Sequence, residues 1–186
     1  MLAVALATAA GCADVEDVTP GSHDELAPGT IYSVDLDGDG ADETIVIDGA
    51  RGSLTITDGD TAYHSRNKWH IVQTWLGDTD HDGLPEVVAL LDAEDGRHLG
   101  LFAFFGGEYR ERLVTSALVP PPLALKVVDS KEVAQEAGFA GEYAGDVIVL
   151  TEEGAGDDAA GGPATRDVVY RWNGFGFTAV LPAPSE

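Results

Sequence analysis

Two short stretches of the chain carry carboxylates at alternating positions, and these residues are the best suited to chemistry. In each stretch acids stand at positions 1, 3, 5 and 9, and a glycine stands at position 6. The acids are Asp35, Asp37, Asp39 and Glu43 in the first stretch, and Asp78, Asp80, Asp82 and Glu86 in the second. Carboxylates packed this closely repel one another unless a cation neutralises them, and glycine permits a sharp backbone turn. The spacing therefore predicts two loops that each bind one metal ion.

The predicted ligands are all oxygen atoms, which select Ca²⁺ or Mg²⁺ over metals that prefer thiolate or imidazole. Backbone carbonyls at position 7, Ala41 and Leu84, are available to complete the ligand sets, and flexible oxygen loops favour the larger Ca²⁺. We therefore expect two calcium sites. The alternative is a pair of solvated acidic turns that bind nothing. His81 stands between ligand positions in the second loop and is expected to face solvent.

An EF-hand has a different pattern from these loops. It needs a bidentate glutamate at position 12 and a helix on each side of the loop. Position 12 is Val46 in the first stretch and Ala89 in the second. The residues after position 9, Thr-Ile-Val-Ile and Val-Val-Ala-Leu, are typical of strands. The same argument disfavours a dockerin, so the closing acid at position 9 opens a strand.

This pattern, Asp-x-Asp-x-Asp-Gly-x-x-Glu directly before a strand, resembles the FG-GAP or VCBS-type repeat of integrin-alpha-like β-propellers. The resemblance covers about residues 31–181 and implies that the eight acids hold calcium between strands. Three apolar runs begin with Glu43, Glu86 and Asp146, at separations of 43 and 60 residues, which suit propeller-blade repeats. The stretch between Asp129 and Asp146 lacks alternating acids, so we expect no metal in the third unit.

The rest of the sequence predicts an all-β fold. Short runs rich in β-branched and aromatic residues are separated by turn residues, and 23 glycines with 9 prolines disfavour long helices. Only Lys131–Ala137 is expected to form a helical turn or two. The expected strands are Thr44–Ile47, Ser53–Ile56, His70–Trp75, Glu86–Leu91, Leu99–Phe105, Leu123–Val128, Asp146–Leu150, Asp167–Trp172 and Gly176–Val180. The segments starting at Phe102 and Val169 each predict a strand, a glycine-containing turn and a second strand.

We expect about three blade-like antiparallel repeats, at about residues 31–75, 76–126 and 127–181. Closed propellers have about 4–8 blades. Three units therefore leave three alternatives: self-association into a homo-oligomer that completes a ring, an open array, or a small sandwich-like domain. The segment of residues 152–165 is rich in Gly, Ala and Asp and is expected to be a surface loop.

The first residues are expected to address the protein rather than to fold. Leu2–Ala10 is a run of small apolar residues, too short to span a bilayer, and fits a secretory signal. Ala9–Cys12 resembles the lipobox of bacterial lipoproteins, which implies that Cys12 carries a lipid and that residues 1–11 are removed. Cys12 is the single cysteine, and an ordinary buried cysteine is the alternative. Residues 13–30 are expected to form an acidic flexible tether to the bacterial cell envelope, outside the cytoplasm.

The charge excludes several classes of function. The chain has ten Lys and Arg and 33 Asp and Glu, giving a net charge of -23. This charge disfavours binding to nucleic acid and electrostatic adhesion to anionic lipid. The sequence has no Gly-x-Ser-x-Gly elbow, phosphate loop or zinc-helix motif. His64 and His70 have no third ligand beside them. The aromatics Trp69, Trp75, Trp172, Phe175 and Phe177 are expected to pack in the core rather than to form a carbohydrate platform.

We therefore expect a calcium-stabilised scaffold that recognises a protein or a glycan, and not an enzyme. A secreted hydrolase whose carboxylates pair only in space is the main alternative. A calcium buffer with no partner is a third hypothesis.

Overall fold

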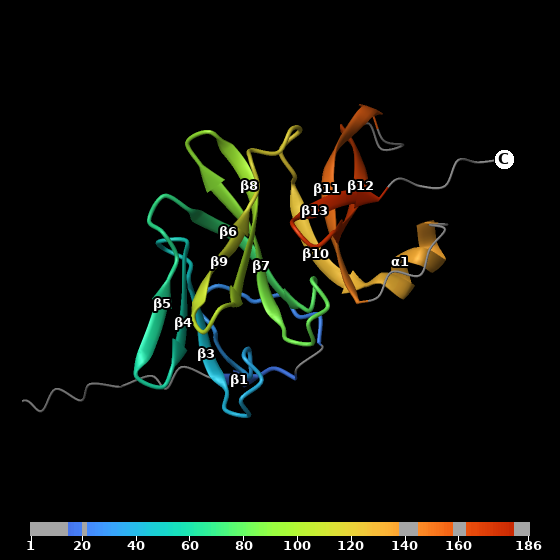
Figure 1. The fold of residues 1–186 in the computed structure, drawn as a ribbon. Helices are drawn as coiled ribbons and strands as arrows, with labels where there is room; N and C mark the ends of the chain where they lie inside the picture. Colours follow the sequence, from blue (N-terminus) through green and yellow to red (C-terminus); the bar gives the residue numbers. More distant parts are fainter. Residues whose placement is uncertain (1–14, 20–21, 138–144, 158–162, 181–186) are drawn as a thin grey trace, which may run out of the picture.

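The computed structural model describes residues 15–19, 22–137, 145–157 and 163–180, which form three consecutive β-sheets (Figure 1). The first sheet holds β1 (Val15–Asp17), β2 (Ile31–Val34), β3 (Glu43–Asp48), β4 (Ser53–Asp58) and β5 (Thr61–His64). The second holds β6 (His70–Gly77), β7 (Glu86–Ala93), β8 (Gly96–Phe104) and β9 (Tyr109–Val114). The third holds β10 (Ala124–Asp129), β11 (Asp146–Asp157), β12 (Pro163–Trp172) and β13 (Phe177–Val180). The all-β expectation is confirmed.

Each sheet is a meander in which strands that follow one another in sequence pair antiparallel, and β1 adds parallel to β2. The one helix among the described residues, α1 (Ser130–Ala137), connects β10 to β11 and lies where a helical turn or two was predicted. The β8–β9 and β12–β13 hairpins also match the predicted strand–turn–strand segments.

The second sheet lies between the other two and is buried on both faces. In β7, Val87, Ala89 and Leu91 pack in a core shared with the first sheet. The alternate residues Val88 and Leu90 pack in a second core, shared with the third sheet. Successive side chains of a strand point to opposite faces, so the uninterrupted apolar run of β7 reflects burial on both sides.

The outer face of the first sheet is polar, whereas the outer face of the third sheet is apolar and covered by a helix. On β4 of the first sheet, Leu54 points into the core, whereas Ser53 and Thr55 lie on the polar outer face. The outer face of the third sheet carries a small cluster of Val128, Val147, Val169 and Val180. Val133 of α1 packs against these valines, so the helix covers that face.

The predicted units differ from the sheets by one strand. The unit expected at 31–75 ends inside β6, yet β6 pairs with β7 in the second sheet. Counting units from the closing acids caused this offset, because each acid opens the second strand of its antiparallel meander rather than the first. The structure therefore keeps the number of units and moves their boundaries.

The segment expected to be a flexible tether packs against the sheets, as far as its residues are described. β1 extends the first sheet, and Leu26 is 1% exposed in the first core. The Leu26 amide donates to the Thr74 carbonyl at 2.9 Å, and Glu25 forms a bridge with Trp75. A three-residue strand and one leucine among acids produce no periodic signal, which is why the sequence predicted a tether here.

Candidate metal centre

The two acidic stretches form equivalent loops in neighbouring sheets. The first loop connects β2 to β3 and the second connects β6 to β7. Glu43 and Glu86, the closing acids, are the first residues of β3 and β7, and both are buried. The position-9 carboxylate therefore belongs to a buried strand residue, whereas the other three carboxylates belong to the loop.

The same four hydrogen bonds shape both loops. Backbone amides at positions 2, 5, 6 and 7 donate to the carboxylates at positions 9, 3, 1 and 5. Their lengths are 2.6–3.1 Å in the first loop and 2.8–3.2 Å in the second. Ala41 and Leu84 donate two of these bonds, so the position-7 residues do belong to the loops. Their carbonyls stay predicted ligands.

Positive φ angles explain the glycines of the loops. Gly40 and Gly83, at position 6, have φ angles of 89° and 91°, a conformation that side chains other than glycine rarely adopt. At position 4 the first loop has Gly38 at φ 78°, whereas the second has His81 at φ 65°. His81 is exposed, as expected, and its ring lies against Gly145, where a Cβ would overlap it.

The first loop gathers its carboxylates into two overlapping groups, defined here as the first cluster. Asp35, Asp37 and Asp39 form one group, and Asp37, Glu43 and Asp58 form the other. Within each group the ligand oxygens lie within 4.8 Å of one another. Asp58 was not predicted, because it comes from the end of β4 and lies beside Glu43 only through the pairing of β3 with β4.

Glu43 is the buried member of the first cluster. Burial raises its pKa, and the nearby charges of Asp37 and Asp58 add to this effect. The Leu36 amide and the Tyr109 hydroxyl act in the opposite direction. The Tyr109 hydroxyl lies close to Glu43 but has no regular hydrogen-bond partner. A group of carboxylates and one tyrosine hydroxyl thus surround this position.

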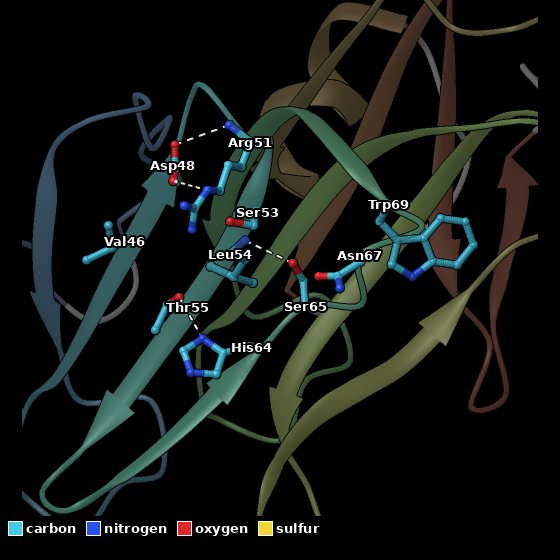
Figure 2. Close-up of a pocket in the computed structure, with 10 residues that line it drawn as sticks. All are labelled: Val46, Asp48, Arg51, Ser53, Leu54, Thr55, His64, Ser65, Asn67 and Trp69. Carbon is cyan, nitrogen blue, oxygen red and sulfur yellow. Dashed lines mark hydrogen bonds and ion pairs between the residues drawn. The ribbon is translucent and has the colours of Figure 1, made fainter.

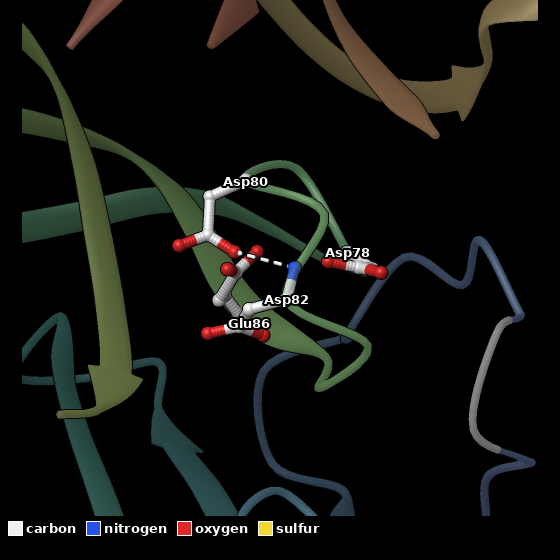
Figure 3. Close-up of side chains that lie close together, drawn as sticks. All are labelled: Asp78, Asp80, Asp82 and Glu86. Carbon is white, nitrogen blue, oxygen red and sulfur yellow. Dashed lines mark hydrogen bonds between the residues drawn. The ribbon is translucent and has the colours of Figure 1, made fainter. Parts of the chain in front are cut away.

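The second loop gathers Asp78, Asp80, Asp82 and Glu86 into one group, the second cluster, again within 4.8 Å (Figure 3). The side chains of Asp80 and Glu86 are each 2% exposed. Oε2 of Glu86 accepts hydrogen bonds from the Thr79 amide and hydroxyl at 2.8 and 3.0 Å, but Oε1 is buried without a partner. Burial, followed by the proximity of Asp80, raises the pKa of Glu86 well above its usual range.

Both clusters fit a hard divalent cation. Every member is a carboxylate, with no thiolate or imidazole in any of the three groups found among the described residues. Oxygen ligands of this kind suit Ca²⁺ and Mg²⁺. The buried Oε1 of Glu86, a member of the second cluster, has no hydrogen-bond partner, and a bound cation would satisfy it. The clusters could therefore each hold a metal ion.

The second cluster also receives an arginine from β9. Arg112 forms an ion pair with Asp80, and its Nη1 lies 3.8 Å from Asp82 and 3.9 Å from Glu86. The Arg112 side chain is 17% exposed. Sequence spacing could not identify Arg112, because β9 is brought to the loop by the fold rather than by proximity in the chain. The second loop thus has a cationic side chain where the first has a tyrosine.

The third closing acid has a different role. Asp146, at the start of β11, accepts a hydrogen bond from the Asp78 amide at 2.7 Å. Its other oxygen lies 2.7 Å from Nε2 of His23 in the N-terminal segment. Asp146 therefore joins the second loop, the third sheet and the N-terminal segment at one point.

A separate groove of about 580 Å³ lies along the first sheet (Figure 2). Its side chains are mostly paired with one another: Thr55 with His64, Asp48 with Arg51, and the Leu54 amide with Ser65. Trp69 closes one end and is 6% exposed. Nδ1 of His64 lies 3.0 Å from the Thr55 hydroxyl.

Cys12, the predicted lipid attachment point, lies outside the described residues. Within the described ranges, no helix is long and apolar enough to cross a membrane. The fold and the site define an all-β protein of three stacked sheets with two carboxylate loops. Comparisons with protein-family models, curated proteins and solved structures gave no match to this chain.

Proposed function

We propose that this chain is a calcium-stabilised β-repeat domain that presents a recognition surface on a bacterial cell envelope. The observation that carries the proposal is the buried Oε1 of Glu86, which lacks a donor and faces three further carboxylates. The equivalent loop in the neighbouring sheet, with the same four hydrogen bonds, supports it. The resemblance to FG-GAP or VCBS-type repeats points in the same direction.

The ligand residues follow from the two clusters. Asp35, Asp37, Asp39, Glu43 and Asp58 would hold the first ion, and the four acids of the second cluster would hold the second. The bound ion supplies positive charge that offsets the mutual repulsion of the carboxylates. Each loop joins the first two meander strands of its sheet, so bracing both loops adds the binding free energy to the stability of the fold.

The location of the protein would make this stabilisation conditional. Extracellular calcium modules bind Ca²⁺ at about 10⁻⁴–10⁻³ M. Sites in that range would be filled outside the cell and empty in the cytoplasm. Attachment through Cys12 would then place a calcium-rigidified domain on the outside of the membrane.

A thermal melt of the full chain in millimolar Ca²⁺, in Mg²⁺ and in EGTA tests the proposal. Millimolar Ca²⁺ exceeds a Kd of about 10⁻⁴ M by about tenfold, so each site adds about 1.4 kcal/mol to the free energy of unfolding. This should raise Tm by several degrees in Ca²⁺ and by less in Mg²⁺. Identical melting curves in Ca²⁺ and EGTA would mean that the loops are solvated turns and would refute the proposal.

A hydrolase is the second candidate, favoured by one observation. A groove of about 260 Å³ is lined by two carboxylates, Asp58 and Glu108, together with Tyr63 and Tyr109. Paired acids in a groove are the arrangement that glycoside hydrolysis needs. A panel of nitrophenyl glycosides, compared between the wild type and Glu108→Gln, tests it. Hydrolysis that disappears in the variant would replace the scaffold function with an enzymatic one.

A further inference from the structure

A groove lies between β9 and the turn that joins β12 to β13. It has a volume of about 440 Å³ and is lined by Phe105, Arg110, Glu111, Arg112, Trp172, Gly174 and Phe175. The one carboxylate among them, Glu111, accepts hydrogen bonds from Arg66 and Trp69 at 2.9 and 2.8 Å and is therefore already neutralised. Neither calcium loop lines this groove, and the calcium-stabilised scaffold gives it no role. Its residues combine aromatic rings with two guanidinium groups.

The positive charge is unusual for this protein. The chain has ten Lys and Arg against 33 acids, yet Arg110 and Arg112 line the same groove. The guanidinium carbon of Arg110 lies 4.6 Å from the centre of the Phe105 ring, and that of Arg112 lies 4.7 Å from it. Arg110 is 41% exposed, and its nearest carboxylate, Glu108, lies 3.6 Å away on the surface. The groove is therefore a local site for an anion on an acidic molecule.

Two aromatic side chains of the groove are exposed, and one of them stands on a hydrogen-bonded turn. Phe175 is 94% exposed and Phe105 is 45% exposed. Phe175 lies in a turn that Asn173 holds: the Asn173 Oδ1 accepts hydrogen bonds from the Phe175 and Gly176 amides at 3.0 and 3.1 Å. An ordered turn that presents a phenylalanine to solvent leaves an apolar ring face free for a ligand.

We propose that this groove binds a carboxylate-bearing sugar, such as a uronic acid unit of a glycan, and that Ca²⁺ in the second loop strengthens the binding. The proposal rests on the calcium-stabilised function above and deepens it by naming the ligand. A sugar ring has an apolar face that can lie on Phe175 or Phe105, and its carboxylate can accept paired hydrogen bonds from a guanidinium group.

Arg112 connects the two sites because it contacts both. On one side it pairs with Asp80, and on the other it lies against Phe105 and, at 5.2 Å, Trp172. Without calcium, the charge of Arg112 is taken up by the second cluster. Once Ca²⁺ neutralises Asp80 and Glu86, the guanidinium group can turn its donors toward the groove. The two ligands therefore strengthen each other's binding.

An acidic peptide is the competing occupant, and the groove favours it less. A peptide that binds a sheet edge uses the backbone of the edge strand, here β9. The groove instead offers ring faces and guanidinium groups from side chains. These groups recognise a ring with a carboxylate more directly than they recognise an extended chain.

The test is calorimetric titration of the full chain with a tetrasaccharide of alternating glucuronate and N-acetylglucosamine, in Ca²⁺ and in EGTA. We expect binding that weakens about tenfold or more in EGTA, as loss of a hydrogen bond to a charged group implies. The carboxyl-reduced, neutral tetrasaccharide should not bind. Arg112→Gln should lose about tenfold in affinity in Ca²⁺, and Phe175→Ala should lose several-fold, with its melting curve unchanged because the ring is 94% exposed.

Arg51→Gln serves as the matched control, since Arg51 is 83% exposed and lies on the first sheet. Equal loss in that variant, equal binding of the neutral sugar, or binding of hexaglutamate peptide in place of the sugar would overturn the inference. A Ca²⁺-dependent rise in Tm without tetrasaccharide binding would overturn the inference alone and leave the proposed function standing. Tetrasaccharide binding that is the same in Ca²⁺ and EGTA, with no change in Tm, would overturn both.

Discussion

The two acidic loops share one backbone conformation but differ in what neutralises them. Both use the same amides to hold the same carboxylate positions. In the first cluster the additional residues are Asp58 and Tyr109, which bring no positive charge. In the second cluster the additional residue is Arg112, which pairs with Asp80. The same sequence motif thus produces one cluster with no cationic side chain in its carboxylate groups and one that pairs with an arginine.

This difference shows that ligand spacing predicts the shape of a loop better than its affinity for a metal. A metal ion entering the second loop must displace the contact between Arg112 and Asp80, which costs part of the binding free energy. The first loop has no such competitor in its two carboxylate groups. We therefore expect the first loop to bind Ca²⁺ more tightly than the second.

The largest expected effect comes from breaking both loops at once. Asp37→Asn together with Asp80→Asn removes a central carboxylate from each cluster and should abolish most of the calcium-dependent rise in Tm. The loss is about 1.4 kcal/mol for each site at about tenfold excess of Ca²⁺ over Kd, measured by differential scanning calorimetry in millimolar Ca²⁺ and in EGTA. Asp42→Asn is the control, because Asp42 is at position 8 and accepts a hydrogen bond from Ser33. An equal loss in the control would contradict the ligand assignment.

Replacing the internal cation should make the second loop resemble the first. Arg112→Gln leaves the buried carboxylates of Asp80 and Glu86 without a positive partner, so the metal-free protein should lose about 1–3 kcal/mol of stability. Calcium affinity of the second loop should rise, as isothermal titration would show. Arg110→Gln, on the same strand, is the control. An unchanged calcium affinity in Arg112→Gln would remove the distinction between the loops.

Lowering the pH should increase the difference in calcium affinity between the two loops. The folded pKa of Glu86 lies above its unfolded value, so its favourable contribution to metal-free stability is complete below about pH 4.5 and is lost as pH rises toward the folded pKa. Calcium binding must displace the proton from Glu86, so affinity at the second loop should increase by up to about tenfold per pH unit. Calcium titrations from pH 6 to 8 measure this. The dependence should vanish in Glu86→Gln, and its persistence there would assign the proton to another group.

The smallest expected effect concerns position 4 of the loops. His81→Gly gives the second loop the residue type that the first loop has at Gly38. It also removes the strain of a non-glycine residue at a positive φ of 65°. The change in unfolding free energy should stay within about 1 kcal/mol, because the flexible unfolded chain offsets the relief. At the same position of the first loop, Gly38→Ala should lower the free energy of unfolding. The new Cβ would lie 2.9 Å from the Leu84 side chain, and the residue has a positive φ of 78°. Urea melts distinguish the two, and a loss of calcium response in His81→Gly would make His81 a ligand.

What the sequence predicted well was local. The alternating acids and the strand after each closing acid lie within a few residues of one another, so spacing alone places them. Asp58, Arg112 and His23 were not predictable, because strand pairing and sheet stacking bring them to the loops from distant parts of the chain. The burial of the aromatic residues was also predicted only in part. Trp69 is in a core as predicted, whereas Phe175 is 94% exposed because it occupies a turn.

The packing of the N-terminal segment on the first sheet has a consequence for distance. Val15 begins β1, and it follows Cys12 by three positions, with two residues between them. An extended chain covers at most about 10 Å over that span. If Cys12 carries a lipid, the start of β1 would therefore lie within about 10 Å of the lipid attachment point. Such an anchor would fix which side of the molecule faces the membrane and which side meets the outside.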